Sequence, residues 1–273
     1  MGTWFSGWAG AIEPGDERDW RIEKFGRDDL FGGNGSLEKV DTILFDLDGT
    51  LRHNRPSFVQ AFYDYAVSLG VPDGVERRRK AARWAHYYWA QSDELEQDSK
   101  QFNFDEEPYW VHYAHRSLIA FDCNADCATA LAPEVQRYMH QEHNSEDYVP
   151  DDVPITLRRL KNASYRLGLL SNRSQPCQEY LEEIGLAEFF DLALVAGEVN
   201  SWKPDPEIFN QAILRLEAKP ERTIYIGDNY YADIVGAKNA ALIPLLIDPD
   251  DVFPDADCLV VKSIGDLPQL LNL

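Results

Sequence analysis

Short apolar runs alternate with amphipathic segments along most of the chain. The amphipathic segments repeat apolar residues at helical spacing, as in 206–216. Buried strands that alternate with helices are typical of a parallel sheet with helices on both faces. The pattern therefore predicts an α/β fold with a Rossmann-like parallel sheet core. The predicted strands are 40–45, 166–170, 192–196, 223–226, 242–247 and 259–261.

The region between the first two predicted strands has a different pattern. Apolar and aromatic residues recur there at helical spacing, and no strand alternation interrupts them. We therefore expect an inserted all-helical cap domain at 54–149, and an α/β core made of 39–53 and 150–273. Ligands of such sheets bind beyond the carboxyl ends of the strands, so the insertion is expected to cover that site. Four helices are expected there. The first has Pro56 at its first position, the second runs from Val75, the third contains Tyr109, and the fourth runs from about Pro133 to His143.

Aromatic side chains are frequent in the predicted cap. We expect most of them to form the core of its helix bundle, because large aromatic residues dominate such cores. They are Trp84, Tyr87, Tyr88, Trp89, Tyr109, Trp110 and Tyr113. Residues 1–38 lack a sustained period and end in a glycine-rich stretch, so they are predicted to be an N-terminal extension of unknown role.

The chain is strongly acidic. It has 273 residues, with 47 Asp and Glu against 26 Lys and Arg, which gives a formal net charge of -21. Such a charge disfavours nucleic acid and anionic membrane surfaces as partners. The four cysteines fit a reducing interior, and the N-terminal residues do not resemble a signal peptide, so a cytoplasmic location is expected. A site for an anion would need local positive potential from a lysine, a helix N-terminus or a metal ion.

Polar side chains follow four of the predicted strands. Because the carboxyl ends of parallel strands share one edge of the sheet, these side chains are expected to converge on one crevice. Carboxylates with one lysine suit a Mg²⁺ ion together with a phosphate group, because Mg²⁺ prefers a few carboxylates, waters and phosphate oxygens. The residues, in strand order, are Asp46 and Asp48, then Ser171 and Asn172, then Lys203, and finally Asp228 with Asp233.

The chemistry of these residues favours phosphoryl transfer. Asp46 could attack phosphorus as a nucleophile, and Asp48 lies on the same side of an extended chain, where it could serve as general acid and base. Ser171 and Asn172 offer neutral donors for phosphate oxygens. Gly49 allows a tight turn with backbone amides available as further donors.

These residues stand in four motifs that resemble those of the haloacid dehalogenase-like (HAD) hydrolase superfamily. The motifs are Asp46-Leu47-Asp48-Gly49-Thr50, Ser171-Asn172, Lys203-Pro204-Asp205-Pro206, and Gly227-Asp228-Asn229 with Asp233. The resemblance covers 40–273, and the insertion after the first motif is similar to the helical type 1 cap of this superfamily.

The resemblance implies a role for each motif residue. Asp46 would form an aspartyl-phosphate, and Asp48 would be the general acid and base. Mg²⁺ would be bound by Asp46, by the backbone carbonyl of Asp48 and by Asp228, with Asp233 acting indirectly or through water. The phosphate-binding residues would be Gly49, Thr50, Ser171, Asn172 and Lys203.

The sequence thus predicts a Mg²⁺-dependent phosphatase that hydrolyses a small-molecule phosphomonoester, with a small phosphorylated metabolite as its partner. Asp48 argues against a dehalogenase, because a departing halide needs no proton whereas the alkoxide of a phosphate ester does. A phosphosugar mutase with the same intermediate and a non-catalytic binding protein remain alternatives. Arg173 is a candidate for a second contact with an anion.

Overall fold

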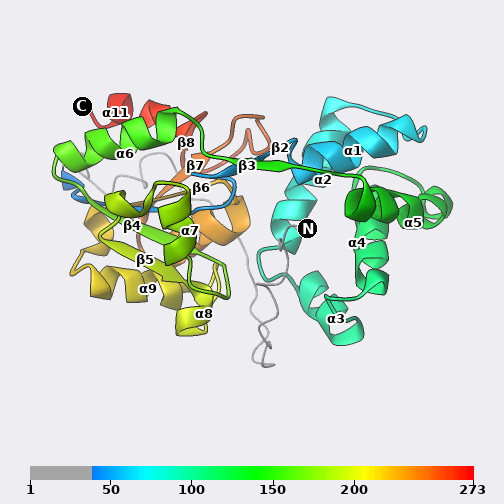
Figure 1. The fold of residues 1–273 in the computed structure, drawn as a ribbon, viewed down its shortest axis with the longest axis horizontal. Helices are drawn as coiled ribbons and strands as arrows, with labels where there is room; N and C mark the ends of the chain where they lie inside the picture. The colour runs from blue at the N-terminus through cyan, green and yellow to red at the C-terminus, as the bar shows by residue number, and fades with distance from the viewer. Residues whose placement is uncertain (1–38) are drawn as a thin grey trace. The chain divides into compact units, whose positions relative to one another are not determined.

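A parallel six-stranded sheet forms the centre of the larger part of the protein. The computed structural model describes residues 39–273 (Figure 1). The strands follow the order β5-β4-β1-β6-β7-β8, and every neighbouring pair is parallel. The α/β Rossmann-like fold predicted from the sequence is confirmed. The strands are β1 (Thr42–Phe45), β4 (Arg166–Ser171), β5 (Leu192–Val195), β6 (Thr223–Gly227), β7 (Ile243–Ile247) and β8 (Leu259–Val261).

Each face of this sheet is buried under its own helices. Successive side chains of a strand point to opposite faces, and the two apolar clusters follow this alternation. Ile43 and Phe45 pack with α6 (Asp152–Asn162) and α7 (Gln178–Glu183), whereas Leu44 packs with α9 (Pro206–Arg215). Further short helices of this part are α8 (Ala196–Val199), η2 (Ala187–Phe189), η3 (Pro220–Arg222), α10 (Gly236–Asn239), η5 (Ile264–Asp266) and α11 (Leu267–Leu270).

The helical stretch that follows β6 divides into two segments. Residues Tyr230–Val235 form a π-helix, η4, and α10 follows it. The side chain of Asn229 accepts hydrogen bonds from the backbone amides of Tyr231 and Ala232 at 3.0 Å each, so it caps the wide first turn. π-Turns of this kind recur at functional sites.

The described chain divides into two compact units. One contains the described residues up to Leu51 together with Val149–Leu273, and the other is Arg52–Tyr148. No helix of the described residues is long and apolar enough to cross a membrane. The N-terminal extension predicted at 1–38 lies outside the described residues. All four cysteines are free thiols.

The second unit is a helical bundle closed by a small antiparallel sheet. Its helices are α1 (Phe58–Ser68), α2 (Val75–Tyr88), α3 (Asp93–Gln101), α4 (Glu107–Ala120) and α5 (Ala125–Gln141). The strands β2 (His53–Arg55) and β3 (Glu146–Tyr148) pair at the two ends of the insertion. The predicted aromatic core is confirmed for Tyr88, Tyr109 and Tyr113, which are buried.

Three features of this unit differ from the sequence prediction. The sequence pattern did not indicate β2 and β3, because three polar residues are too few to show alternation. It also did not indicate α3, whose apolar content is a single leucine, Leu95; its cap is Ser92, which accepts from the Leu95 amide at 3.1 Å. Pro133 was expected to begin a helix but lies inside α5, which begins earlier because Asn124 caps it.

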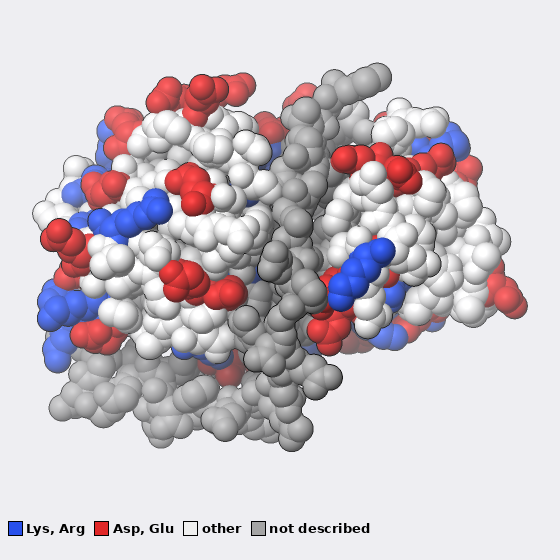
Figure 2. Space-filling model, turned by 90° about the horizontal axis from the view of Figure 1, so that it is seen from below, with Lys and Arg blue, Asp and Glu red and all other residues white. Residues whose placement is uncertain are grey.

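Acidic side chains are spread over both units on the face drawn in Figure 2, in several separate groups. Basic side chains lie between them rather than forming a single patch on this face. On this face the acidic charge is therefore spread out and does not gather in one patch. Such a surface favours solubility and leaves attraction of an anion to local groups.

A buried carboxylate joins three helices of the helical unit. Asp98 on α3 is 2% exposed. It accepts a hydrogen bond from the Tyr88 hydroxyl at 2.9 Å and one from Arg116 Nη2 at 3.0 Å. Arg116 Nε completes the ion pair, 2.9 Å from Asp98 Oδ2. A charge this deep is stable only when it is paired and hydrogen-bonded, so Asp98 fastens α3 to α2 and α4.

We expect Asp98→Ala to lower the free energy of unfolding by about 2–4 kcal/mol, because Arg116 and Tyr88 lose a buried partner. Glu96→Ala on the same helix is the matched control. It removes an exposed pair with Lys100, which contributes less than about 0.5 kcal/mol. Urea denaturation followed by tryptophan fluorescence measures both. Equal losses for the two variants would show that the Asp98 network adds nothing beyond a surface pair.

Candidate active site

The predicted site residues lie where the central strands end. β1 has β4 and β6 as its direct neighbours. The amide of Asp46 donates to the carbonyl of Ile226 at 2.8 Å, which extends the β1–β6 pairing by one residue. Asp46, Ser171 and Asp228 therefore follow three adjacent strands at one edge of the sheet.

Lys203 lies at the centre of these residues. Its Nζ donates to Asp46 Oδ1 at 2.6 Å, to Asp233 Oδ1 at 2.7 Å and to the hydroxyl of Tyr225 at 2.9 Å. The residue is 2% exposed. An ammonium group has three donors, and all three are used here. Burial alone would lower the pKa of Lys203, but the charges of Asp233 and Asp46 raise it well above its usual range.

The side chain of Asn172 holds the backbone of Lys203. Its Oδ1 accepts from the Lys203 amide at 2.7 Å, and its Nδ2 donates to the Lys203 carbonyl at 3.0 Å. The pair of bonds fixes the loop after β5 against the end of β4. These contacts make Asn172 a positioning residue; the phosphate contact expected from the sequence stays a prediction.

Tyr225 belongs to the site, although the sequence analysis did not select it. It lies on β6 with no exposed surface, and its hydroxyl donates to Asp233 Oδ1 at 3.1 Å while it accepts from Lys203. One signal could have revealed it. A tyrosine inside a buried apolar strand needs a partner for its hydroxyl, and β6 leads directly into the fourth motif.

The π-turn after β6 brings Asp233 back to the strand end. Asp233 Oδ2 accepts from the backbone amide of Asn229 at 2.9 Å, and the residue is 1% exposed. A Cβ on Gly227 would lie 2.2 Å from this same oxygen. Only glycine leaves room for so close an approach.

Gly49 leaves room for the Asp228 carboxylate, as Gly227 does for Asp233. Its φ is +92°, in the region that favours glycine, and a Cβ there would lie 2.5 Å from Asp228 Oδ2. Thr50 is buried, with its hydroxyl 3.5 Å from Asp228 Oδ1. The turn after β1 is therefore shaped around the Asp228 carboxylate.

Three carboxylates of the cluster have the geometry of a cation site. Asp46, Asp228 and Asp233 each offer an oxygen within 4.8 Å of the others. Burial raises the pKa of Asp46 to about 7; the charges of Asp233 and Asp48 add to the shift, and Lys203 opposes it. Burial, together with the charges of Asp46 and Asp233, also raises the pKa of Asp228 well above its usual range. One lysine thus leaves negative charge uncompensated, which suits a hard divalent cation such as Mg²⁺.

The remaining predicted residues are Asp48 and Ser171. Ser171 is buried at the end of β4, and its hydroxyl accepts from the Arg173 amide at 3.3 Å. Asp48 forms a two-pronged ion pair with Arg173, with both bonds 2.8 Å long. The structure therefore brings the residues of all four motifs to the same end of the sheet.

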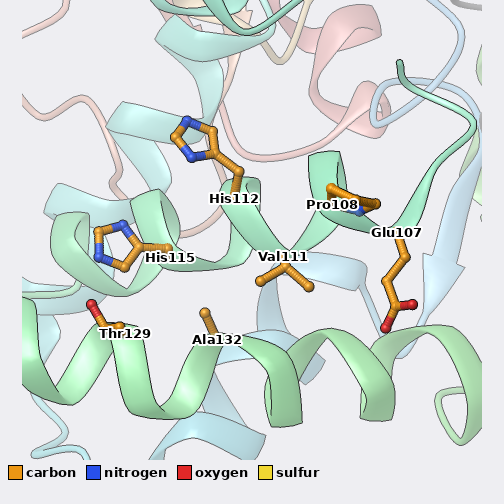
Figure 3. A pocket seen from close by; sticks show the side chains of 7 residues that line it. All are labelled: Glu107, Pro108, Val111, His112, His115, Thr129 and Ala132. Carbon is orange, nitrogen blue, oxygen red and sulfur yellow. The ribbon is translucent and has the colours of Figure 1, made fainter. Parts of the chain in front are cut away.

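A separate hollow of about 440 Å³ lies in the helical unit. Figure 3 shows Val111 of α4 facing Ala132 of α5 across it, with His115 near Thr129. The full lining is Glu107, Pro108, Val111, His112, His115, Thr129 and Ala132. None of the motif residues lines this hollow, which is therefore distinct from the cluster at the strand ends.

We expect Gly49→Ala to weaken Mg²⁺ binding at least about tenfold, because the new Cβ must displace the Asp228 carboxylate. Gly70→Ala is the matched control. Its φ is +96°, so it imposes similar backbone strain, but no atom lies within 4 Å of the added Cβ. Isothermal titration with MgCl₂ measures both. Equal affinities for the two variants would exclude Asp228 as a ligand.

Comparison with known proteins also indicates a hydrolase. A family model described as haloacid dehalogenase-like hydrolase matches residues 40–241. The pyrophosphatase PpaX of Bacillus cereus (strain B4264) is 27% identical over 205 residues, which cover 74% of this chain and 80% of the relative.

Solved structures share the fold. The putative HAD-hydrolase YfnB of Bacillus subtilis, bound to magnesium, has a TM-score of 0.53 at 21% identity, covering 86% of this chain and 99% of its own. A dehalogenase solved as an intermediate complex has a TM-score of 0.51 at 19% identity, covering 85% and 97%. Such likenesses show the fold and do not distinguish the activities. The family match, which spans most of the chain, shows that this protein belongs to the haloacid dehalogenase-like hydrolases.

Proposed function

We propose that this protein is a Mg²⁺-dependent phosphatase that acts on a small phosphorylated metabolite through an aspartyl-phosphate at Asp46. The observation that supports this best is the bond from Lys203 Nζ to Asp46 Oδ1 at 2.6 Å, in a buried cluster that contains two further carboxylates. The ion pair orients one oxygen of Asp46 and leaves the other oxygen as the candidate nucleophile.

The proposed reaction has two steps. A carboxylate oxygen of Asp46 forms a bond to phosphorus while the bond from phosphorus to the leaving oxygen breaks. Asp48 gives its proton to that oxygen. Asp48 then takes a proton from water as the water oxygen attacks phosphorus, and the bond from phosphorus to Asp46 breaks. One alcohol and one phosphate are released for each water consumed.

The other residues position the reacting groups. Ser171 and Lys203 would hold the oxygens of the phosphoryl group, and Tyr225 and Asn172 would hold Lys203. A magnesium ion held by Asp46, Asp228 and the carbonyl of Asp48 would neutralise charge on the phosphoryl group. Asp233 would act indirectly, because both of its oxygens already accept hydrogen bonds from protein groups.

Two considerations narrow the choice of reaction type and of substrate. Asp48 supplies the proton that a phosphate ester needs and a departing halide does not, which favours phosphoryl transfer over dehalogenation. A relative that matches 74% of this chain is the pyrophosphatase PpaX, which makes pyrophosphate the first compound to test beside phosphomonoesters. The helical unit is proposed to serve as the cap that selects the substrate, as its insertion after the first motif suggests.

We expect phosphate release from a panel of phosphomonoesters and pyrophosphate in the presence of MgCl₂. EDTA should abolish it, and Asp46→Asn should lower kcat at least about 10³-fold, because the amide removes the nucleophile. Asp41→Asn is the control. Asp41 immediately precedes β1 at its opposite end, where it pairs with Arg166 and Arg222. This variant should keep full activity.

Other outcomes would redirect the assignment. Isomerised sugar phosphates that appear only with a bisphosphate activator would identify a phosphomutase. Halide release from 2-haloacids would identify a dehalogenase. If Mg²⁺ binds and no compound turns over, the proposal of an enzyme is wrong and a binding role replaces it.

A further inference from the structure

We propose that Arg173 binds a second anionic group on the leaving side of the substrate, so that the enzyme prefers substrates whose leaving group is itself an anion, as in a diphosphate. This inference rests on the proposed phosphatase function and names its substrate class. It concerns Arg173, a residue to which the proposed mechanism assigns no role.

The guanidinium of Arg173 and the carboxylate of Asp48 form a fork-to-fork ion pair. Arg173 Nε donates to Asp48 Oδ2 and Arg173 Nη2 donates to Asp48 Oδ1, each at 2.8 Å. The side chains are 27% and 37% exposed. The pair is thus open to solvent and can exchange partners, unlike the buried pair between Lys203 and Asp46.

Tyr180 supports the guanidinium of Arg173, and two hydrogen bonds hold its backbone. The guanidinium lies over the ring of Tyr180 with its Cζ 4.5 Å from the ring centroid. The Arg173 amide donates to the Ser171 hydroxyl at 3.3 Å, and its carbonyl accepts from the Gly197 amide at 3.1 Å. Arginine stacked in this manner is preorganised for planar, two-pronged recognition of carboxylate or phosphate oxygens.

The distances place the guanidinium beside the leaving group. A general acid must lie about 3 Å from the leaving oxygen to transfer its proton. Arg173 lies one further hydrogen bond beyond Asp48, so its donors are within about 6 Å of that oxygen. In a diphosphate the second phosphorus is bonded directly to the leaving oxygen, and its outer oxygens therefore come within reach of Arg173.

An anionic leaving group would also release Asp48. In the free enzyme both carboxylate oxygens bond to the guanidinium, which competes with the leaving oxygen for Asp48. A second anion that takes over the guanidinium replaces this ion pair with another of equal charge. A neutral leaving group offers no such replacement, so the pair must open without compensation.

The test compares substrates across variants of Arg173. Pyrophosphate has its second anion on the leaving atom, 2-phosphoglycolate has a carboxylate further along, and glycerol 3-phosphate has a neutral leaving group. Arg173→Met should lower kcat/KM for pyrophosphate about 10- to 100-fold. The value for glycerol 3-phosphate should stay within about threefold or rise, because Asp48 loses its competitor. Arg173→Lys, which keeps the charge without the fork, should restore part of the preference.

Two comparisons make the result decisive. Arg158→Met is the control, because Arg158 also pairs with a carboxylate, Glu188 at 3.0 Å, and lies over an aromatic ring, that of Phe189. Arg158→Met should leave the ratios of kcat/KM between the three substrates unchanged. The change in kcat/KM for 2-phosphoglycolate on Arg173→Met shows whether a carboxylate suffices as the second anion or a phosphate is needed. If Arg173→Met lowers kcat/KM for all three substrates by the same factor, Arg173 only supports Asp48 and the inference is wrong.

Failure of the proposed function would be seen separately. If the wild-type protein turns over none of the three compounds, the phosphatase proposal fails first. Binding of pyrophosphate to the Asp46→Asn protein, measured by calorimetry, still tests Arg173. Weaker binding after Arg173→Met, with unchanged binding of glycerol 3-phosphate, would support an anion site at Arg173. Equal binding of pyrophosphate with and without Arg173 would overturn it.

Discussion

The buried ammonium of Lys203 is the interaction on which the site depends. It joins Asp46 after β1 to Asp233 in the turn after β6 and to the Tyr225 hydroxyl within β6. Without it, two carboxylates that are almost fully buried would face each other with no compensating charge. In the proposed phosphatase this local positive charge would oppose the general field of a protein with a net charge of -21 and so favour a phosphate at the site.

That constraint explains the unusual local geometry around the cluster. Gly227 and Gly49 allow carboxylates within distances that a Cβ would occupy, and the π-turn directs Asp233 toward Lys203. Asn172 fixes the backbone of Lys203 through two hydrogen bonds. These features cost conformational freedom and add little to the core, which indicates that they serve the site. The solvent-open pair of Asp48 and Arg173 can rearrange, whereas the Lys203 cluster is fixed.

The sequence predicted the sheet and the convergence of the motif residues, because apolar runs mark buried strands and parallel strands end at one edge. Other features left no pattern to read. Helix α3 has a single apolar residue and is held by its cap and by Asp98, and the pairing of β2 with β3 joins residues far apart in sequence. The pairing of Asp48 with Arg173 depends on side-chain directions at two separate strand ends. Tyr225 was readable in principle, since a buried hydroxyl requires a partner.

The proposed mechanism requires that Asp46, oriented by Lys203, forms a covalent bond to phosphorus. The most direct measurement is to mix the enzyme with MgCl₂ and a ³²P-labelled substrate, quench with acid within one turnover, and locate the label by peptide mapping. We expect label on the peptide that contains Asp46. With a labelled substrate whose leaving group needs no proton, such as p-nitrophenyl phosphate, Asp48→Asn should carry more label, because it lacks only the base for the second step. Steady release of phosphate with no label on that peptide in either protein would contradict it.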